Sequence, residues 1–210
     1  MATRLFLLRH AEVEERFHRV FGGQLDMNLS PEGHRQAECL AKYLRATCFD
    51  AIYASPMKRA QQTLAPLLKD RRCPNCVLPD LREIHFGDWT GLSWQQLHDR
   101  HQISAFEWLH QLESGSIPNA EDAGAVRQRV AQCLDTILEA QRGKTVAVLC
   151  HGGIIRMILS ILLESPLSKM SALEIEYASL TEVECDGQRH RVHLLNLTPW
   201  RDLPQPSIAP

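Results

Sequence analysis

The sequence predicts an α/β fold in which a mostly parallel sheet carries helices on both faces, a three-layer α/β/α arrangement. Short apolar runs alternate with amphipathic segments along the chain, and several of the runs end in a polar residue or a glycine turn before a helix. With 210 residues, 44% of them hydrophobic, the chain is long enough for one well-buried domain and short for two. We therefore expect a single domain over residues 1–198 and a flexible tail over 199–210.

The first strand–helix unit has clear boundaries. Residues 3–8 are short, apolar and uninterrupted, which predicts a buried strand. An irregular loop over 11–29 follows. Ser30 and Pro31 then open a helix, because serine is a preferred N-cap and proline fits the first helical position.

The same alternation continues to the carboxyl end of the chain. Its regularity favours strands that run parallel, each joined to the next by a helix. The remaining expected elements are a strand at 51–54, a helix opened by Ser55-Pro56 and ending near Leu68, a short strand at 77–81, helices at 93–112, 121–141 and 152–163, a strand at 144–149, and closing strands at 174–185 and 190–195.

Charge and hydropathy exclude several classes of partner. The net charge of -2 argues against a dominant nucleic-acid or anionic-membrane surface, since these need a basic excess. No apolar run approaches the roughly 20 residues that span a bilayer. The stretch Leu5–Leu8 is too short for a signal-peptide core and runs into Arg9. We expect a cytoplasmic protein with no nucleic-acid or membrane partner.

The seven cysteines are an odd number and are scattered, which favours reduced thiols over a disulfide framework. Cys73 and Cys76 form one C-x-x-C pair, but no second pair or nearby histidine completes a four-ligand zinc site. We interpret this pair as part of a connector loop and expect no metal.

Polar residues follow several strands at the edge where a parallel sheet builds its sites. They are Arg9 and His10 after the first strand, Arg59 after the second, Glu83 after the third and His151 after the fourth. Arginine suits phosphate because its planar fork donates paired hydrogen bonds and stays charged. Histidine is a competent phosphoryl acceptor when its second ring nitrogen is held by a hydrogen bond. The set predicts phosphate chemistry.

The acid for such chemistry is expected to be Glu83. An alkyl P–O bond breaks slowly unless the departing oxygen is protonated. Glu83 is the strand-edge carboxylate followed by a Gly/Trp loop, although Asp80 or Asp88 could take the same role. The chain has neither a phosphate-binding loop signature nor a dinucleotide fingerprint, so we expect no cofactor.

Five ordered motifs resemble those of the histidine phosphatase superfamily, in its phosphoglycerate mutase-like branch. The similarity covers residues 4 to about 198 and is strongest to the short phosphatases, including those that act on α-ribazole phosphate. The motifs are Leu-Leu-Arg-His-Ala-Glu at 7–12, Leu-Ser-Pro-Glu-Gly-His-Arg-Gln-Ala at 29–37, Ala-Ser-Pro-Met-Lys-Arg-Ala-Gln-Gln-Thr at 54–63, Leu-Arg-Glu-Ile-His-Phe-Gly-Asp-Trp-Thr-Gly at 81–91 and Val-Leu-Cys-His-Gly-Gly-Ile-Ile-Arg at 148–156.

The resemblance implies a phosphoglycerate mutase-like fold and assigns roles. His10 would be the nucleophile that forms a phosphohistidine, and Glu83 would protonate the leaving alkoxide and then activate water. Arg16 stands where the family commonly has a phosphate-contacting asparagine. The implied phosphate-binding residues are Arg9, Arg59, His151, Gly152, Gly23, Gln24 and Arg16.

The resemblance favours a metal-independent phosphatase of a small phosphorylated metabolite. A mutase that returns the phosphoryl group to a product is the alternative, and a phospho-ligand binding module without turnover is a third reading. The compact 92–124 segment favours the phosphatase. Arg16, Arg19 and Arg82 are candidates for contacting a second anionic group of the substrate, and a homodimer is left open.

Overall fold

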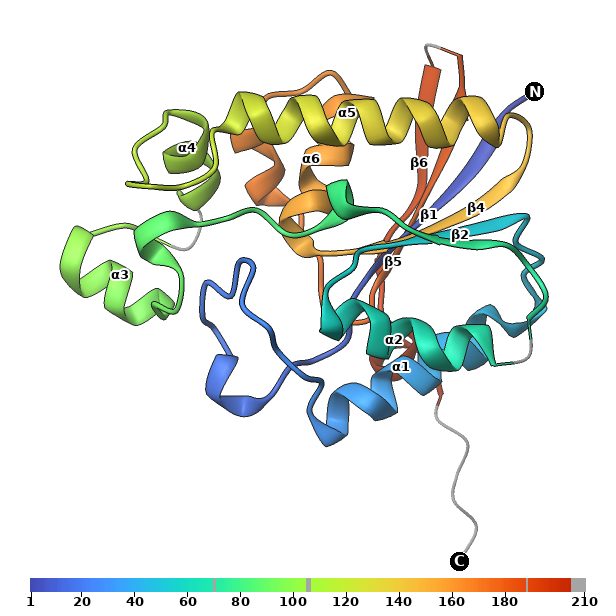
Figure 1. Cartoon of the computed structure of the whole chain (residues 1–210), viewed down its shortest axis with the longest axis horizontal. Helices are drawn as coiled ribbons and strands as arrows, with labels where there is room; N and C mark the ends of the chain where they lie inside the picture. Colours follow the sequence, from blue (N-terminus) through green and yellow to red (C-terminus); the bar gives the residue numbers. More distant parts are fainter. Residues whose placement is uncertain (70, 105–106, 188, 205–210) are drawn as a thin grey trace, which may run out of the picture.

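The computed structural model describes residues 1–69, 71–104, 107–187 and 189–204, and consists of a six-stranded sheet between two helical layers (Figure 1). The strand order is β3-β2-β4-β1-β5-β6. In this order the strands β3, β2, β4 and β1 run parallel to one another, whereas β5 is antiparallel to both β1 and β6. The strands are β1 (Thr3–Arg9), β2 (Ala51–Ala54), β3 (Asn75–Val77), β4 (Thr145–Cys150), β5 (Leu180–Asp186) and β6 (Arg189–Leu197). This confirms the predicted three-layer α/β/α fold.

Helices cover both faces of the sheet. α1 (Pro31–Tyr43) and α2 (Lys58–Leu68) lie on one face, while α5 (Ala123–Ala140) and α6 (Gly152–Leu162) lie on the other (Figure 1). β1 serves both layers because successive side chains of a strand point to opposite faces. Phe6 and Leu8 pack in the core under α1 and α2, and Leu5 and Leu7 pack in the core under α5 and α6.

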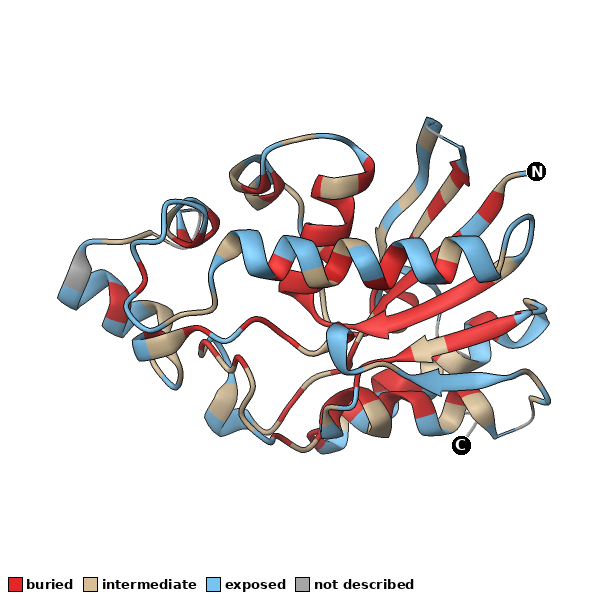
Figure 2. Cartoon of the chain, turned by 45° about the horizontal axis from the view of Figure 1, so that its top comes forward, coloured by how far each residue is buried: buried red, intermediate tan, exposed pale blue. Residues whose placement is uncertain are grey.

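The centre of the sheet is the most completely buried part of the fold (Figure 2). Five of the six residues of β4 are buried, as expected for a parallel strand covered on both faces. β1 and β4 are paired in a register that sets Arg9 opposite Cys150. The residues that follow these strands, His10 and His151, therefore leave the sheet side by side.

Several element boundaries differ from those predicted. The 93–112 segment holds two helices, α3 (Trp94–His101) and α4 (Trp108–Glu113), because the backbone turns left-handed at Gln102. α2 begins at Lys58, since the Ser55 hydroxyl bonds His151 and does not cap the helix. Residues 199–202 of the predicted tail form α7 (Pro199–Asp202), which lies against α1. The short 3-10 turns are Glu15–Phe17, Leu44–Ala46, Pro79–Leu81, Gly87–Trp89 and Leu167–Ala172.

Two further expectations concern the third strand and the closing strands. β3 ends at Val77, and residues 79–81 of the predicted strand form a 3-10 turn. β5 starts at Leu180, since residues 174–179 form a loop that bonds the end of β1. No helix within the described ranges is both long and apolar enough to cross a bilayer.

The start of α1 ties the helix to the loop that follows His10. The Ser30 hydroxyl accepts the Gly33 N–H (2.9 Å) as predicted for an N-cap, and donates to Glu12 Oε1 (2.6 Å). The Ser30 N–H also donates to the Glu12 carbonyl (3.0 Å). Gly33 packs directly on this carbonyl, because a Cβ at residue 33 would lie 2.0 Å from the Glu12 oxygen.

Replacing Gly33 with alanine tests this packing. Alanine favours a helix over glycine by about 1 kcal/mol, but the Cβ would meet backbone, which cannot move aside cheaply. We expect Gly33→Ala to lower the free energy of unfolding by about 1–2 kcal/mol net in urea titrations. The exposed neighbour His34 provides the control, and His34→Ala should stay within about 0.5 kcal/mol of wild type. A Gly33→Ala protein as stable as wild type would contradict the close contact.

Candidate active site

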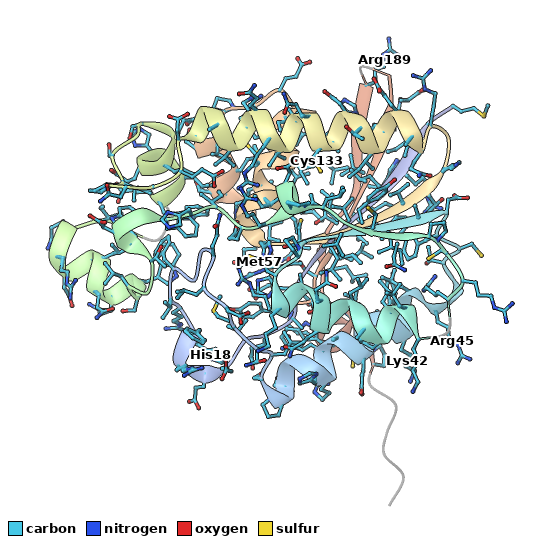
Figure 3. All side chains as sticks on the ribbon, viewed as in Figure 1. His18, Lys42, Arg45, Met57, Cys133 and Arg189 are labelled. Carbon is cyan, nitrogen blue, oxygen red and sulfur yellow. The ribbon has the colours of Figure 1, made fainter. Side chains whose placement is uncertain are left out.

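A cavity of about 570 Å³ opens beyond the carboxyl ends of the central strands. Its lining includes four of the predicted catalytic residues, namely Arg9, His10, Arg59 and Glu83. Arg59 comes from the first turn of α2, whose N-cap residue Met57 is labelled near the centre of the molecule in Figure 3. The residues thus reach one place from β1, α2 and the connection after β3.

His10 is oriented and kept neutral by its surroundings. The ring Nδ1 lies 2.8 Å from the Ala11 carbonyl, which assigns the ring hydrogen to Nδ1 and leaves a lone pair on Nε2. Arg59 Nε donates to this Nε2 (3.2 Å). Burial, reinforced by the positive charges of Arg59 and Arg9, holds the pKa of His10 well below its ordinary value. His10 is therefore an unprotonated imidazole at neutral pH.

Arg59 is fixed by carbonyl groups rather than by a carboxylate. Its side chain is 2% exposed, and it donates to the carbonyls of Gly23 (2.7 Å) and Leu25 (3.0 Å). Burial lowers the pKa of Arg59 to about 10, which leaves it charged at neutral pH. Gly23 was predicted to bind phosphate, and in the structure its carbonyl positions the arginine.

Arg9 is held in a similar way. One guanidinium nitrogen donates to the Ile175 carbonyl (2.5 Å), and its Cζ lies 4.1 Å from the centre of the Tyr177 ring. Within the described ranges, neither Arg9 nor Arg59 has a carboxylate oxygen within 4.0 Å of its guanidinium nitrogens. Two positive charges therefore face the cavity without an ion-pair partner, which suits an anionic ligand.

His151 packs directly against His10. The two ring centres are 5.1 Å apart, and His151 Nε2 lies 2.7 Å from the Ser55 hydroxyl. Burial lowers the pKa of His151 well below its ordinary value, and Arg59, His10 and Arg9 add to the effect. The ring is completely buried and does not line the cavity, and its Nδ1 has no hydrogen-bond partner among the described residues.

Glu83 is seated on the cavity wall by two backbone N–H groups. Its carboxylate accepts from Ile84 (3.0 Å) and from Gly153 in the first turn of α6 (3.1 Å). A Cβ at Gly153 would lie 2.5 Å from Glu83 Oε1, so only glycine leaves room for the carboxylate. The alternative acids, Asp80 and Asp88, are exposed and lie outside the cavity lining. Of these three carboxylates, Glu83 is the one that lines the cavity.

Some predicted phosphate contacts lie elsewhere. Arg16 lies in the 3-10 turn Glu15–Phe17, and its side chain bonds Glu14 (3.1 Å), is 69% exposed and does not line the cavity. Gln24 donates to the Glu83 carbonyl (3.0 Å) and so supports that residue's backbone. Gly152 does line the cavity, as predicted, whereas the next N–H, that of Gly153, is taken by Glu83.

Sequence reasoning missed other residues of the cavity. Arg156 lies in the last motif and lines the wall, donating to the carbonyls of Gly152 (3.2 Å) and Leu173 (2.8 Å). Tyr177 lies in a loop without periodic pattern, so no local signal marks it. Of the three arginines considered for a second anion, Arg19 alone lines the cavity. An edge-to-face aromatic cluster forms another wall, with Phe21, Phe86, Trp94 and Trp108.

The described ranges contain no cluster of three or more His, Cys, Asp or Glu side chains arranged to hold a metal ion. The groups that line the cavity have a chemistry that suits a phosphoryl group. Arginine guanidiniums bind its oxygens, a neutral imidazole offers a nucleophile, and a carboxyl group offers a proton.

Comparisons with known proteins agree with this arrangement. A sequence model of the histidine phosphatase superfamily (branch 1) matches residues 5–198. "Putative phosphoserine phosphatase 2" of Hydrogenobacter thermophilus is 28% identical, covering 92% of this chain and 95% of its own. The adenosylcobalamin/alpha-ribazole phosphatase of Escherichia coli is 25% identical with the same coverage.

Solved structures give the same result. The crystal structure of a putative alpha-ribazole-5′-P phosphatase from Escherichia coli superimposes with a TM-score of 0.81 at 25% identity, covering 94% of this chain and 98% of that one. A mycobacterial glucosyl-3-phosphoglycerate phosphatase gives a TM-score of 0.82 at 26% identity, covering 93% and 99%. The chain is a phosphatase that hydrolyses small-molecule phosphomonoesters through a phosphohistidine. In sequence, fold and site chemistry alike, it belongs to the histidine phosphatase superfamily (branch 1).

Proposed function

We propose that His10 Nε2 attacks the phosphorus of the bound phosphomonoester and becomes phosphorylated. The observation that carries this assignment is the state of the ring: Nδ1 holds the hydrogen against Ala11, burial disfavours protonation, and Nε2 faces the cavity arginine. A neutral imidazole with a fixed tautomer is a nucleophile that needs no separate base.

Arg9 and Arg59 are proposed to hold the phosphoryl oxygens and to stabilise the negative charge that spreads over them in the transition state. Their support is the absence of competing carboxylates within 4.0 Å in the described part of the chain. His151 is proposed to complete this set, because its ring lies against His10 and its Nδ1 is unpaired among the described residues.

Glu83 is proposed to act twice. It first donates its proton to the departing alkoxide as the P–O bond breaks and the P–N bond to His10 forms. It then takes a proton from the water that attacks the phosphohistidine, which releases inorganic phosphate and restores His10. The support is its place on the cavity wall, where the N–H groups of Ile84 and Gly153 hold the carboxylate.

The cavity has room for more than a phosphoryl group. Its volume of about 570 Å³ falls in the range of ordinary small-molecule sites. Relatives are named for phosphoserine and for α-ribazole phosphate, whose alcohol parts differ widely in size. We propose that the aromatic wall and the rim residues Arg19, Arg156, Glu174 and Glu176 select the alcohol part of a phosphorylated metabolite.

We also propose that the protein works in the cytoplasm. All seven cysteines are free thiols, including the buried Cys133, Cys150 and Cys185, as is common where the surroundings are reducing. The homodimer stays a prediction.

Loss of His10 should abolish turnover. We expect His10→Ala to release no phosphate from a panel of phosphomonoesters, since His10 is the proposed phosphoryl acceptor, while the exposed His34→Ala retains wild-type activity. The assays follow free phosphate, acid-labile phosphoprotein and positional isomers of 3-phosphoglycerate, with and without EDTA. Isomer exchange without phosphate release would identify a mutase, and no conversion at all would favour the binding-module alternative. EDTA-sensitive activity would contradict the metal-independent mechanism.

Glu83→Gln should separate substrates by their leaving groups. An alkyl phosphate needs the proton from Glu83, so its kcat should fall by about 10²–10⁴-fold, the usual contribution of general acid catalysis. The first step with p-nitrophenyl phosphate should change little, because nitrophenolate departs without a proton, and burst-phase kinetics isolate that step. Asp80→Asn, an exposed carboxylate nearby, is the control and should leave both rates unchanged. Equal losses for the two substrates in Glu83→Gln would argue against the acid role.

The buried histidines should make stability depend on pH. Below the ordinary pKa of about 6.5, the unfolded chain binds protons that folded His10 and His151 do not, because their folded pKa values are depressed. The free energy of unfolding is therefore not reduced by these rings above that pH. Below it, acidification lowers the free energy of unfolding by up to about 1.4 kcal/mol per pH unit for each ring. In urea titrations between pH 7.5 and 5, His10→Asn should show a shallower slope than wild type and than His34→Ala. Identical slopes would show that folded His10 titrates normally.

A further inference from the structure

Tyr177 contacts two groups of the active site although it belongs to none of the motifs. Its ring centre lies 4.1 Å from the Arg9 guanidinium carbon and 5.5 Å from the centre of the His10 ring. The same side chain lines the cavity. One aromatic ring thus lies beside both the proposed nucleophile and the guanidinium of Arg9, a cavity-lining arginine.

The backbone around Tyr177 is held from three directions. The Ala178 N–H donates to the His10 carbonyl (3.1 Å), and the Arg9 N–H donates to the Ser179 carbonyl (3.1 Å), so the loop is bonded to the end of β1. The Trp200 indole donates to the Tyr177 carbonyl (2.8 Å). On the other side, the Glu176 N–H donates to the Asn196 side chain (2.6 Å). These hydrogen bonds limit movement of the backbone at Tyr177 and so keep its ring beside Arg9 and His10.

The Tyr177 ring orients the Arg9 guanidinium without neutralising its positive charge. A carboxylate would orient the guanidinium but would also offset the charge needed for the phosphoryl group. An aromatic face attracts the cation while leaving the N–H edge of the guanidinium free to donate. In the described part of the chain, the contacts that hold the Arg9 guanidinium are this ring and the Ile175 carbonyl. Arg59, by contrast, is fixed by two carbonyls and by His10.

We propose that Tyr177 is a positioning residue, whose ring holds the Arg9 guanidinium and the His10 imidazole in the orientation used for phosphoryl transfer. The proposal rests on the function proposed for His10. It assigns the effect to the aromatic face, so phenylalanine can replace tyrosine whereas an aliphatic side chain of similar reach cannot.

Two substitutions at this position test the proposal. Binding of inorganic phosphate is measured by calorimetry, and kcat and KM are measured with p-nitrophenyl phosphate. We expect Tyr177→Leu to weaken phosphate binding and to lower kcat/KM by about tenfold, the size of a partly desolvated cation–π contact. Tyr177→Phe should stay within about twofold of wild type on both measures, since it keeps the ring. Phosphate affinity of folded protein would not change if the residue only stabilised the fold.

Tyr53→Leu is the matched control for loss of a half-buried tyrosine. Tyr53 lies in β2, its hydroxyl accepts from the Gln141 side chain (3.0 Å), and neither residue lines the cavity. This variant should lower Tm without changing phosphate affinity. The proposal is overturned if Tyr177→Leu keeps wild-type phosphate affinity and kcat/KM, or if Tyr177→Phe falls as far as Tyr177→Leu, which would assign the effect to the hydroxyl.

A failure of the function proposed for His10 would be detected separately, by the assay for phosphohistidine on the wild-type protein. A wild-type protein that forms no acid-labile phosphohistidine would refute the role of His10, whatever Tyr177 does. The phosphate-binding comparison between Tyr177→Phe and Tyr177→Leu needs no turnover, so it still decides whether the ring positions Arg9.

Discussion

The register between β1 and β4 is the constraint on which the site depends. Because Arg9 pairs with Cys150, the two histidines emerge at the same level of the sheet, with ring centres 5.1 Å apart. A slip of one residue would turn the side chains of a strand to the opposite face and separate the rings. Both histidines are buried where they leave these strands, and this burial holds their pKa values well below the ordinary value. The pairing of β1 with β4 thus determines both the packing of the core and the positions of the two neutral imidazoles.

The charges of the site are held by neutral groups. Arg59 rests on the Gly23 and Leu25 carbonyls, Arg9 on the Ile175 carbonyl and the Tyr177 ring, and the Glu83 carboxylate on two backbone N–H groups. Ion pairs among these residues would orient them equally well, but the paired charges would weaken one another's electrostatic potential in the cavity. Dipoles and an aromatic face orient the arginines while their positive field stays directed at the ligand, which is the arrangement that stabilises a developing phosphoryl charge.

Two glycines, Gly23 and Gly153, support neighbouring site residues in ways that the sequence pattern does not reveal. Gly153 leaves room for the Glu83 carboxylate, so the acid and the first turn of α6 are fitted to one another. Gly23 supplies a carbonyl to Arg59 at a backbone φ of +47°, where a side chain would also crowd Ile84 and Phe86. In the loop after His10, Gly23 and Gln24 contact Arg59 and the Glu83 backbone, whereas Arg16 bonds Glu14.

Local sequence determined the strands at 3–9, 51–54 and 145–150 and the start of α1, because apolar runs, N-caps and helix-starting prolines act over a few residues. The ordered motifs likewise predicted that His10, Arg59 and Glu83 lie close together, and all three line the cavity. Tertiary structure alone decided that Tyr177 joins them, that Gly153 receives Glu83, and that Arg16 turns outward to Glu14. It also divided the 93–112 segment into α3 and α4. These outcomes depend on contacts between residues far apart in the chain and on irregular loops, for which hydrophobic periodicity carries no signal.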